Sequence, residues 1–183
     1  MRIVIGITGS SGALYAREFI KRCDADKYLV VSKWGRVLLK DELGISVKEL
    51  LPDVKKEFSD DDLTAPIASG SNEIDAVVIL PCSTSTLGKI ASGIGDTLIT
   101  RAAQVALKER FKLVLCVRET PLTTISLEQC ARLSRDGAII MPISPPMYNL
   151  PTSVDEFVQA YVEKVLAVVG LRQSKGWRAE ELE

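Results

Sequence analysis

Two stretches of this chain share one layout: an apolar run, a loop of small or hydroxyl residues, and a helical segment. The first runs from Arg2 to Leu14 and has glycines at positions 9 and 12. The second runs from Leu80 to Asp96 and carries four hydroxyl residues in a row. Two such strand-to-helix junctions at the carboxyl edge of one parallel sheet form a crevice that favours an anionic ligand.

Strand-like and helix-like segments alternate along the chain, which predicts an α/β fold with a doubly wound parallel sheet. The predicted strands are Arg2–Ile7, Lys27–Ser32, Asp75–Leu80, Lys112–Val117 and Ala138–Met141. One predicted helix begins near Ser11. The others span Trp34–Leu43, Thr84–Ala91, Thr97–Arg110, Ser126–Asp136 and Ser153 to about Val169. We expect one α/β domain over residues 1–170 and a polar C-terminal tail over 171–183.

The region from 44 to 74 has the least regular pattern. Lys55–Asp62 is rich in charge, and we expect it to be polar and exposed. Thr64–Ser71 consists mostly of small residues. A solvent-exposed loop of this length would usually carry more charge, so we expect this segment to pack against another element.

Composition excludes several classes of function. The net charge of −1 gives no basis for nucleic-acid binding. No apolar run is long enough to span a membrane, and the N-terminus lacks the apolar core of a signal peptide. The four Cys, at positions 23, 82, 116 and 130, have no metal-site spacing. We expect reduced thiols, no metal and a cytoplasmic location.

The chain contains no His. The commonest general base near neutral pH is therefore absent, and Ser–His catalysis is excluded. Any proton transfer must use Glu, Asp, Lys, Tyr, Cys, the substrate or a cofactor.

Ligands of such sheets bind outside the carboxyl ends of the strands. Those ends carry hydroxyl clusters, an Arg-Glu pair and a Tyr, which suit a nucleotide-like phosphate. Each signal has a structural alternative: the loop at Gly6–Gly12 can be a plain tight turn, and Ser83–Thr86 can merely cap a helix. The Arg118-Glu119 pair can be a surface ion pair, and Tyr148 can be a packing residue between prolines.

Five blocks together resemble the flavin prenyltransferase (UbiX) family, in the order that the family has them. They are Gly6–Ala13, Ala65–Ser71, Pro81–Leu87, Arg101–Lys108 and Arg118–Leu122. The resemblance runs from Ile3 to about Gly170. It implies a flavodoxin-like Rossmann fold, a three-layer sandwich, and metal-independent transfer of a dimethylallyl group to N5 and C6 of reduced FMN.

The same resemblance implies the partners. The prenyl donor would be dimethylallyl phosphate or pyrophosphate, and the prenylated FMN would serve a UbiD-like decarboxylase. The family assembles as homododecamers with sites at subunit contacts.

Carried over position by position, the resemblance implies three groups of site residues. Those implied to contact FMN are Gly9, Ser10, Ser11, Ser32, Ser83, Thr84, Ser85, Thr86, Arg101 and Arg118. Tyr148 and Lys164 are implied to hold the prenyl phosphate. Ser11, Glu42, Lys108 and Glu119 are implied to take part in catalysis.

One position departs from the family pattern. Some members carry a Trp two residues before the Ala-Pro, where this chain has Leu63. An aromatic face there could stabilise an allylic cation. With Leu63, that stabilisation would rest on the flavin and the departing phosphate.

Three other functions fit these residues less well. A flavin-dependent cysteine decarboxylase of the phosphopantothenoylcysteine type resembles this family but depends on a His that this chain lacks. A direct aromatic-acid decarboxylase would need a route for carboxylate loss that these residues do not supply. An FMN-binding carrier or accessory subunit would not require Glu42, Lys108, Glu119, Tyr148 and Lys164.

Overall fold

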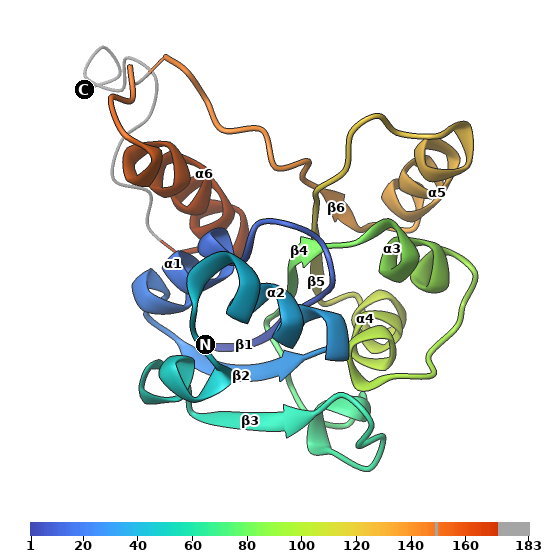
Figure 1. Cartoon of the computed structure of the whole chain (residues 1–183). Helices are drawn as coiled ribbons and strands as arrows, with labels where there is room; N and C mark the ends of the chain where they lie inside the picture. Colours follow the sequence, from blue (N-terminus) through green and yellow to red (C-terminus); the bar gives the residue numbers. More distant parts are fainter. Residues whose placement is uncertain (149, 172–183) are drawn as a thin grey trace, which may run out of the picture.

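A single parallel sheet forms the centre of the molecule in the computed structural model, which describes residues 1–148 and 150–171 (Figure 1). The strand order is β3-β2-β1-β4-β5-β6, and every neighbouring pair is parallel. The strands are β1 (Arg2–Ile7), β2 (Asp26–Val31), β3 (Lys56–Ser59), β4 (Ala76–Cys82), β5 (Lys112–Val117) and β6 (Ile139–Ile140). This order confirms the predicted doubly wound sheet and is that of dinucleotide-binding Rossmann folds.

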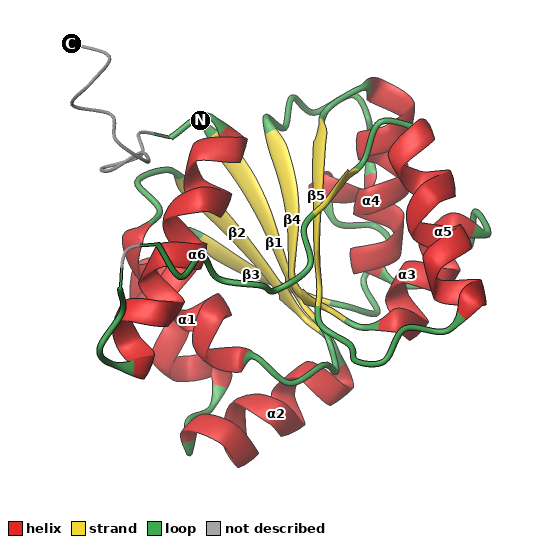
Figure 2. Ribbon diagram, turned by 90° about the horizontal axis from the view of Figure 1, so that it is seen from above, coloured by secondary structure: helices red, strands yellow, loops and turns green. Residues whose placement is uncertain are grey.

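Helices cover both faces of the sheet and make three layers (Figure 2). They are α1 (Ala13–Arg22), α2 (Lys33–Leu43), α3 (Thr84–Ala91), α4 (Leu98–Glu109), α5 (Thr124–Arg135) and α6 (Val154–Val169), with the 3₁₀ helices η1 (Val47–Asp53) and η2 (Pro66–Ala68). Within the described ranges, no helix is long and apolar enough to cross a bilayer.

Alternate residues of each strand supply two separate cores, as a strand's two-residue period requires. Ile3, Ile5 and Ile7 of β1 pack with α1 and α6. Val4, on the opposite face, belongs to the core formed by α3, α4 and α5. The continuous apolar run of β1 therefore arises because both of its faces are covered.

The sheet has a topological switch point between β1 and β4, where the strands that follow in the chain change from one side of β1 to the other. From β1 the chain adds β2 and β3 on one side, whereas β4, β5 and β6 lie on the other. Gly6 of β1 pairs with Ile79 of β4, so the loops that follow these two strands leave the sheet side by side. Such a switch point is where ligands bind in open α/β sheets.

The sequence predicted no strand within the polar segment Lys55–Asp62, but Lys56–Ser59 forms β3 and pairs with β2. An edge strand can be mostly polar because much of its surface faces water. Here only Phe58 is buried, beside Tyr28. A single apolar residue cannot show the two-residue period of a strand, so the sequence did not indicate β3.

The other predicted helices and strands begin and end within about two residues of the observed ones in most cases. Thr64–Ser71 does pack: Ala65, Ile67 and Ala68 are buried in the core beneath α4. Helix α1 begins at Ala13 rather than near Ser11, because Gly12 has a φ of 127° and ends the loop. The predicted tail, apart from Leu171, lies outside the described residues.

A glycine sets the distance between α2 and the end of β1. A Cβ on Gly35 would stand 2.5 Å from the backbone oxygen of Ile7. That same oxygen accepts a hydrogen bond from the Ser32 N–H at 3.0 Å. Because both contacts involve backbone, α2 can start this close to β1 only with glycine at position 35.

We predict that Gly35→Ala lowers the free energy of unfolding by about 2 kcal/mol, since overpacking costs about 1–3 kcal/mol. The matched control is Gly88→Ala in α3, where a Cβ would meet only the end of the Gln129 side chain at 3.2 Å. Helix propensity favours alanine by up to about 1 kcal/mol, so the control should be neutral or stabilising. Denaturant unfolding at one protein concentration measures both. Equal effects would contradict the close approach.

Candidate functional site

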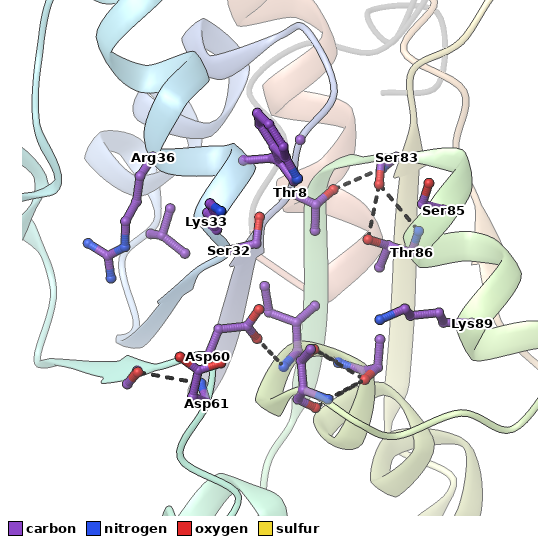
Figure 3. Close-up of a pocket in the computed structure, with 17 residues that line it drawn as sticks. Thr8, Ser32, Lys33, Arg36, Asp60, Asp61, Ser83, Ser85, Thr86 and Lys89 are labelled. Atoms are coloured by element: carbon purple, nitrogen blue, oxygen red, sulfur yellow. Dashed lines mark hydrogen bonds between the residues drawn. The ribbon is translucent and has the colours of Figure 1, made fainter.

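A cavity of about 590 Å³ lies at the carboxyl ends of β1, β2, β3 and β4 (Figure 3). Of the residues predicted from the sequence, it brings together five: Gly9, Ser32, Ser83, Ser85 and Thr86. They come from three separate strand-to-helix junctions. The predicted crevice between the first two junctions is therefore a real cavity, and the second strand also contributes to it.

Three helices begin at this cavity, and each is capped by a hydroxyl residue that lines it. The Ser32 side chain accepts from Gly35 N–H at 3.0 Å, Ser83 from Thr86 at 3.3 Å and Thr97 from Thr100 at 3.4 Å. A capping oxygen that accepts from the backbone can still donate its own proton. Three helix N-termini and their hydroxyls make a site suited to an anion.

Thr8 joins the two loops that form the centre of the cavity. Its side chain is buried, donates to the Pro81 carbonyl at 2.8 Å and accepts from the Ser83 N–H at 2.9 Å. One hydroxyl thus fixes the end of β1 against the start of α3. The sequence places Thr8 directly after the first predicted strand but indicates no role for it, because the partner lies 75 residues away.

Asp60 occupies the start of α4. Its carboxylate accepts from the Ile99 N–H at 2.9 Å, and its carbonyl accepts from the Leu98 N–H at 2.7 Å. Burial raises the pKa of Asp60, and the hydrogen bonds from Ile99 and Thr97 partly oppose that shift. This end of α4 is therefore already satisfied by protein groups.

Gly9 reaches the cavity because it has no side chain. A Cβ at this position would lie 2.4 Å from the Cβ of Trp34, on the first turn of α2. The glycine of the first junction is thus required for the close approach of the β1 loop and α2. The sequence pattern alone could not distinguish this from a plain turn.

A second group of predicted residues lies beside the cavity, toward α1. The Ser10 hydroxyl donates to the carbonyl of Arg118 at 2.5 Å, which ties the loop after β1 to the loop after β5. Burial raises the pKa of Tyr15 on α1, and the nearby Arg118 guanidinium partly opposes this. Tyr15 packs edge-on against Tyr161 of α6, with ring centroids 5.4 Å apart.

Glu42 acts on the same loop from the last turn of α2. Its carboxylate accepts from the N–H groups of Gly12 and Ala13, at 3.0 and 2.9 Å. Gly12 has no side chain with which to cap α1, so Glu42 caps that helix from a distance. This contact accounts for a carboxylate near a helix C-terminus, where the dipole alone disfavours it.

The remaining predicted residues do not line the cavity. Arg101, Lys108, Glu119, Tyr148 and Lys164 are all exposed. On α4, Arg101 donates to the Ala68 carbonyl at 3.2 Å, and Lys108 is paired with Glu109. Glu119 accepts from the Thr120 N–H at 3.0 Å. Thr84, on the first turn of α3, and Ser11, exposed in the loop before α1, are also outside the cavity wall.

The described residues hold no group of three or more His, Cys, Asp or Glu side chains that could bind a metal. The four cysteines are unpaired. Burial raises the pKa of Cys116 to about 12 and also raises that of Cys82. These thiols are therefore protonated near neutral pH and are poor nucleophiles.

Comparison with known proteins places this chain among flavoproteins. Residues 1–172 match the family described as Flavoprotein. The flavin prenyltransferase UbiX of Thermoplasma acidophilum is 45% identical over 93% of this chain and 96% of its own length. The UbiX protein of Methanocaldococcus jannaschii is 40% identical over 97% of this chain and 98% of its own.

Two solved structures share the fold over nearly the whole chain. AnUbiX (PadA1), crystallised with FMN and dimethylallyl pyrophosphate, has a TM-score of 0.91 at 34% identity and covers 97% of this chain and 98% of its own. A dodecameric FMN-dependent UbiX-like decarboxylase from Escherichia coli O157:H7 has a TM-score of 0.92 at 36% identity, covering 97% and 99%.

We predict that Thr8→Val destabilises the protein by about 1–3 kcal/mol, because valine keeps the volume but leaves the Ser83 N–H without its acceptor. Thr8→Ser is the control, since serine retains the hydroxyl. Its cost should be smaller by at least about 1 kcal/mol. Equal destabilisation in denaturant unfolding would show that Thr8 acts by packing alone.

Proposed function

This chain belongs to the UbiX family of flavin prenyltransferases, and on that premise we propose how its residues divide the reaction. The enzyme joins a dimethylallyl group, from the phosphate or the pyrophosphate, to N5 and C6 of reduced FMN. The main support for the proposal is the cavity at the β1/β4 switch point, where three helix N-termini meet.

The cavity fits FMN by size and by chemistry. Its volume of about 590 Å³ lies within the range of small-molecule sites, about 300–1,000 Å³. Hydroxyls at Ser32, Ser83, Ser85 and Thr86 are suited to a ribityl chain and a phosphate. When bound, reduced FMN supplies the nucleophilic nitrogen and the ring carbon that receive the prenyl group.

The prenyl donor needs positive charge where its phosphate departs, since preorganised charge stabilises the transition state. We assign this role to Arg118, with Tyr148 and Lys164 as further contacts to that phosphate. Arg118 stands next to the cavity through the Ser10 contact, and its charge reaches Tyr15 of α1. Lys164 lies on α6, the helix whose Tyr161 packs on Tyr15.

Arg101 and Lys108 support a site shared between subunits. They lie seven residues apart on α4, on its exposed side and away from the cavity of their own chain. The UbiX-like relative from Escherichia coli is dodecameric. In a similar assembly of this chain, the two cations would complete the active site of a neighbouring copy.

Proton removal falls to carboxylates or to the released phosphate, because no His is present. Glu119 is exposed beside Arg118 and accepts only one described hydrogen bond, from the neighbouring Thr120 N–H. Glu42 is already bonded to two backbone N–H groups of the loop that follows Ser11. We therefore assign proton transfer to Glu119 and positioning of the Ser11 loop to Glu42.

The product would then leave for an acceptor enzyme, for which we propose a UbiD-like decarboxylase. Modified FMN is useful only to a protein that binds it in turn. The alternative, an FMN carrier without its own chemistry, is not favoured. A carrier has no need of the cations and carboxylate beside the cavity.

The decisive experiment incubates the purified protein with FMN, a reductant and dimethylallyl phosphate or pyrophosphate. We expect an FMN adduct heavier by one C5 prenyl unit, detected by mass spectrometry of the released flavin. Omission of the reductant is the control and should abolish the adduct. Bound FMN of unchanged mass with both donors would leave the carrier function.

We predict that Glu119→Gln retains FMN but slows adduct formation by about 100-fold, the usual loss when a general base is removed. Glu128→Gln, an exposed carboxylate on α5, is the matched control and should react at the wild-type rate. Single-turnover flavin absorbance gives both rates. Equal rates for the two variants would remove Glu119 from the mechanism.

A further inference from the structure

Three cations line the cavity, and two of them already have carboxylate partners. Arg36 pairs with Glu57 at 2.7 Å, and Lys89 pairs with Asp96 at 2.7 Å. Lys33 forms no ion pair with any residue that the structure describes. Its ammonium lies 5.7 Å from the centroid of the Trp34 ring. Lys33 is therefore the cation of the cavity wall whose charge is available to a ligand.

The backbone around Lys33 is also available. Lys33 and Trp34 are the first two residues of α2, and no acceptor in the described chain contacts their N–H groups. The α4 terminus differs, because Asp60 already accepts from both Leu98 and Ile99. The α3 terminus has open N–H groups, but its nearest cation, Lys89, is engaged by Asp96.

Charge separates the two open termini. A phosphomonoester carries close to two negative charges near neutral pH. Asp60 and Asp61 follow β3, the strand that pairs with β2, so these carboxylates lie on the Lys33 side of the cavity (Figure 3). A phosphate at the start of α2 therefore needs the free ammonium of Lys33 to offset their repulsion.

From this arrangement we propose that Lys33 binds the phosphate of FMN at the N-terminus of α2 and makes the cavity select FMN over riboflavin. The inference rests on the proposed function, since it concerns the same cavity. It also separates two phosphates: that of FMN at α2, and that of the prenyl donor at Arg118 and Lys164.

The test compares two flavins that differ by the phosphate alone. Dissociation constants of FMN and riboflavin are measured by flavin fluorescence for the wild type and for Lys33→Gln in the full-length protein. Charge-assisted hydrogen bonds are strong, so we expect FMN affinity to fall about 10-fold or more. Riboflavin affinity should change less than about two-fold, because it lacks the phosphate.

Two controls make the result specific. Lys40→Gln removes the same charge from the same helix, outside this cavity, and should leave both affinities unchanged. Lys33→Arg keeps the charge and should retain most of the preference for FMN. If Lys33→Gln folds poorly, Lys33→Met replaces it in the same comparison with Lys33→Arg.

An equal loss for both flavins would show that Lys33 merely supports the fold, and unchanged FMN affinity would exclude it from the phosphate site. Either outcome overturns the proposal. Failure of the proposed function looks different: the wild type itself would then bind no FMN, or would bind it without forming the prenylated product.

Discussion

The parallel pairing of β1 with β4 at the centre of the sheet is the constraint on which the rest of this structure depends. Their register brings two strand ends together, and the Thr8 hydroxyl then fixes the two following loops to each other. Two of the helices that line the cavity are positioned from this pair. Helix α2 abuts the end of β1 through Gly35, and α3 starts directly after β4.

The resulting site works by preorganised partial charges. Each helix that opens into the cavity presents N–H groups that its own backbone cannot satisfy. At α4, Asp60 accepts hydrogen bonds from the first-turn N–H groups. At α2 and α3, first-turn N–H groups have no acceptor in the described chain. The cavity therefore offers open N–H groups to an anion at α2 and α3 but not at α4.

Local pattern was sufficient for most of the fold. Buried strands and amphipathic helices show in the sequence because burial on one or two faces imposes a period on apolar residues. The edge strand β3 was missed because its only buried side chain is Phe58, which cannot establish a period. For the site, hydroxyl residues after strands indicated the cavity wall. The pattern could not reveal that Thr8 bridges two loops or that Lys33 lacks an ionic partner.

The sequence by itself determined the parallel α/β class, the hydroxyl-rich strand ends, the absence of histidine chemistry and the family. The first three follow from residue types and short spacings, and the family follows from a resemblance over five blocks in the same order. Only the tertiary structure decided which strand ends meet, which helix termini stay open and which cations stay unpaired. Those properties depend on partners such as Glu57 for Arg36 and Asp60 for α4, which are close in space but far apart in the chain. The two junctions thus predict a crevice, and ion pairing around it leaves Lys33 as a cavity cation without an ionic partner in the described chain.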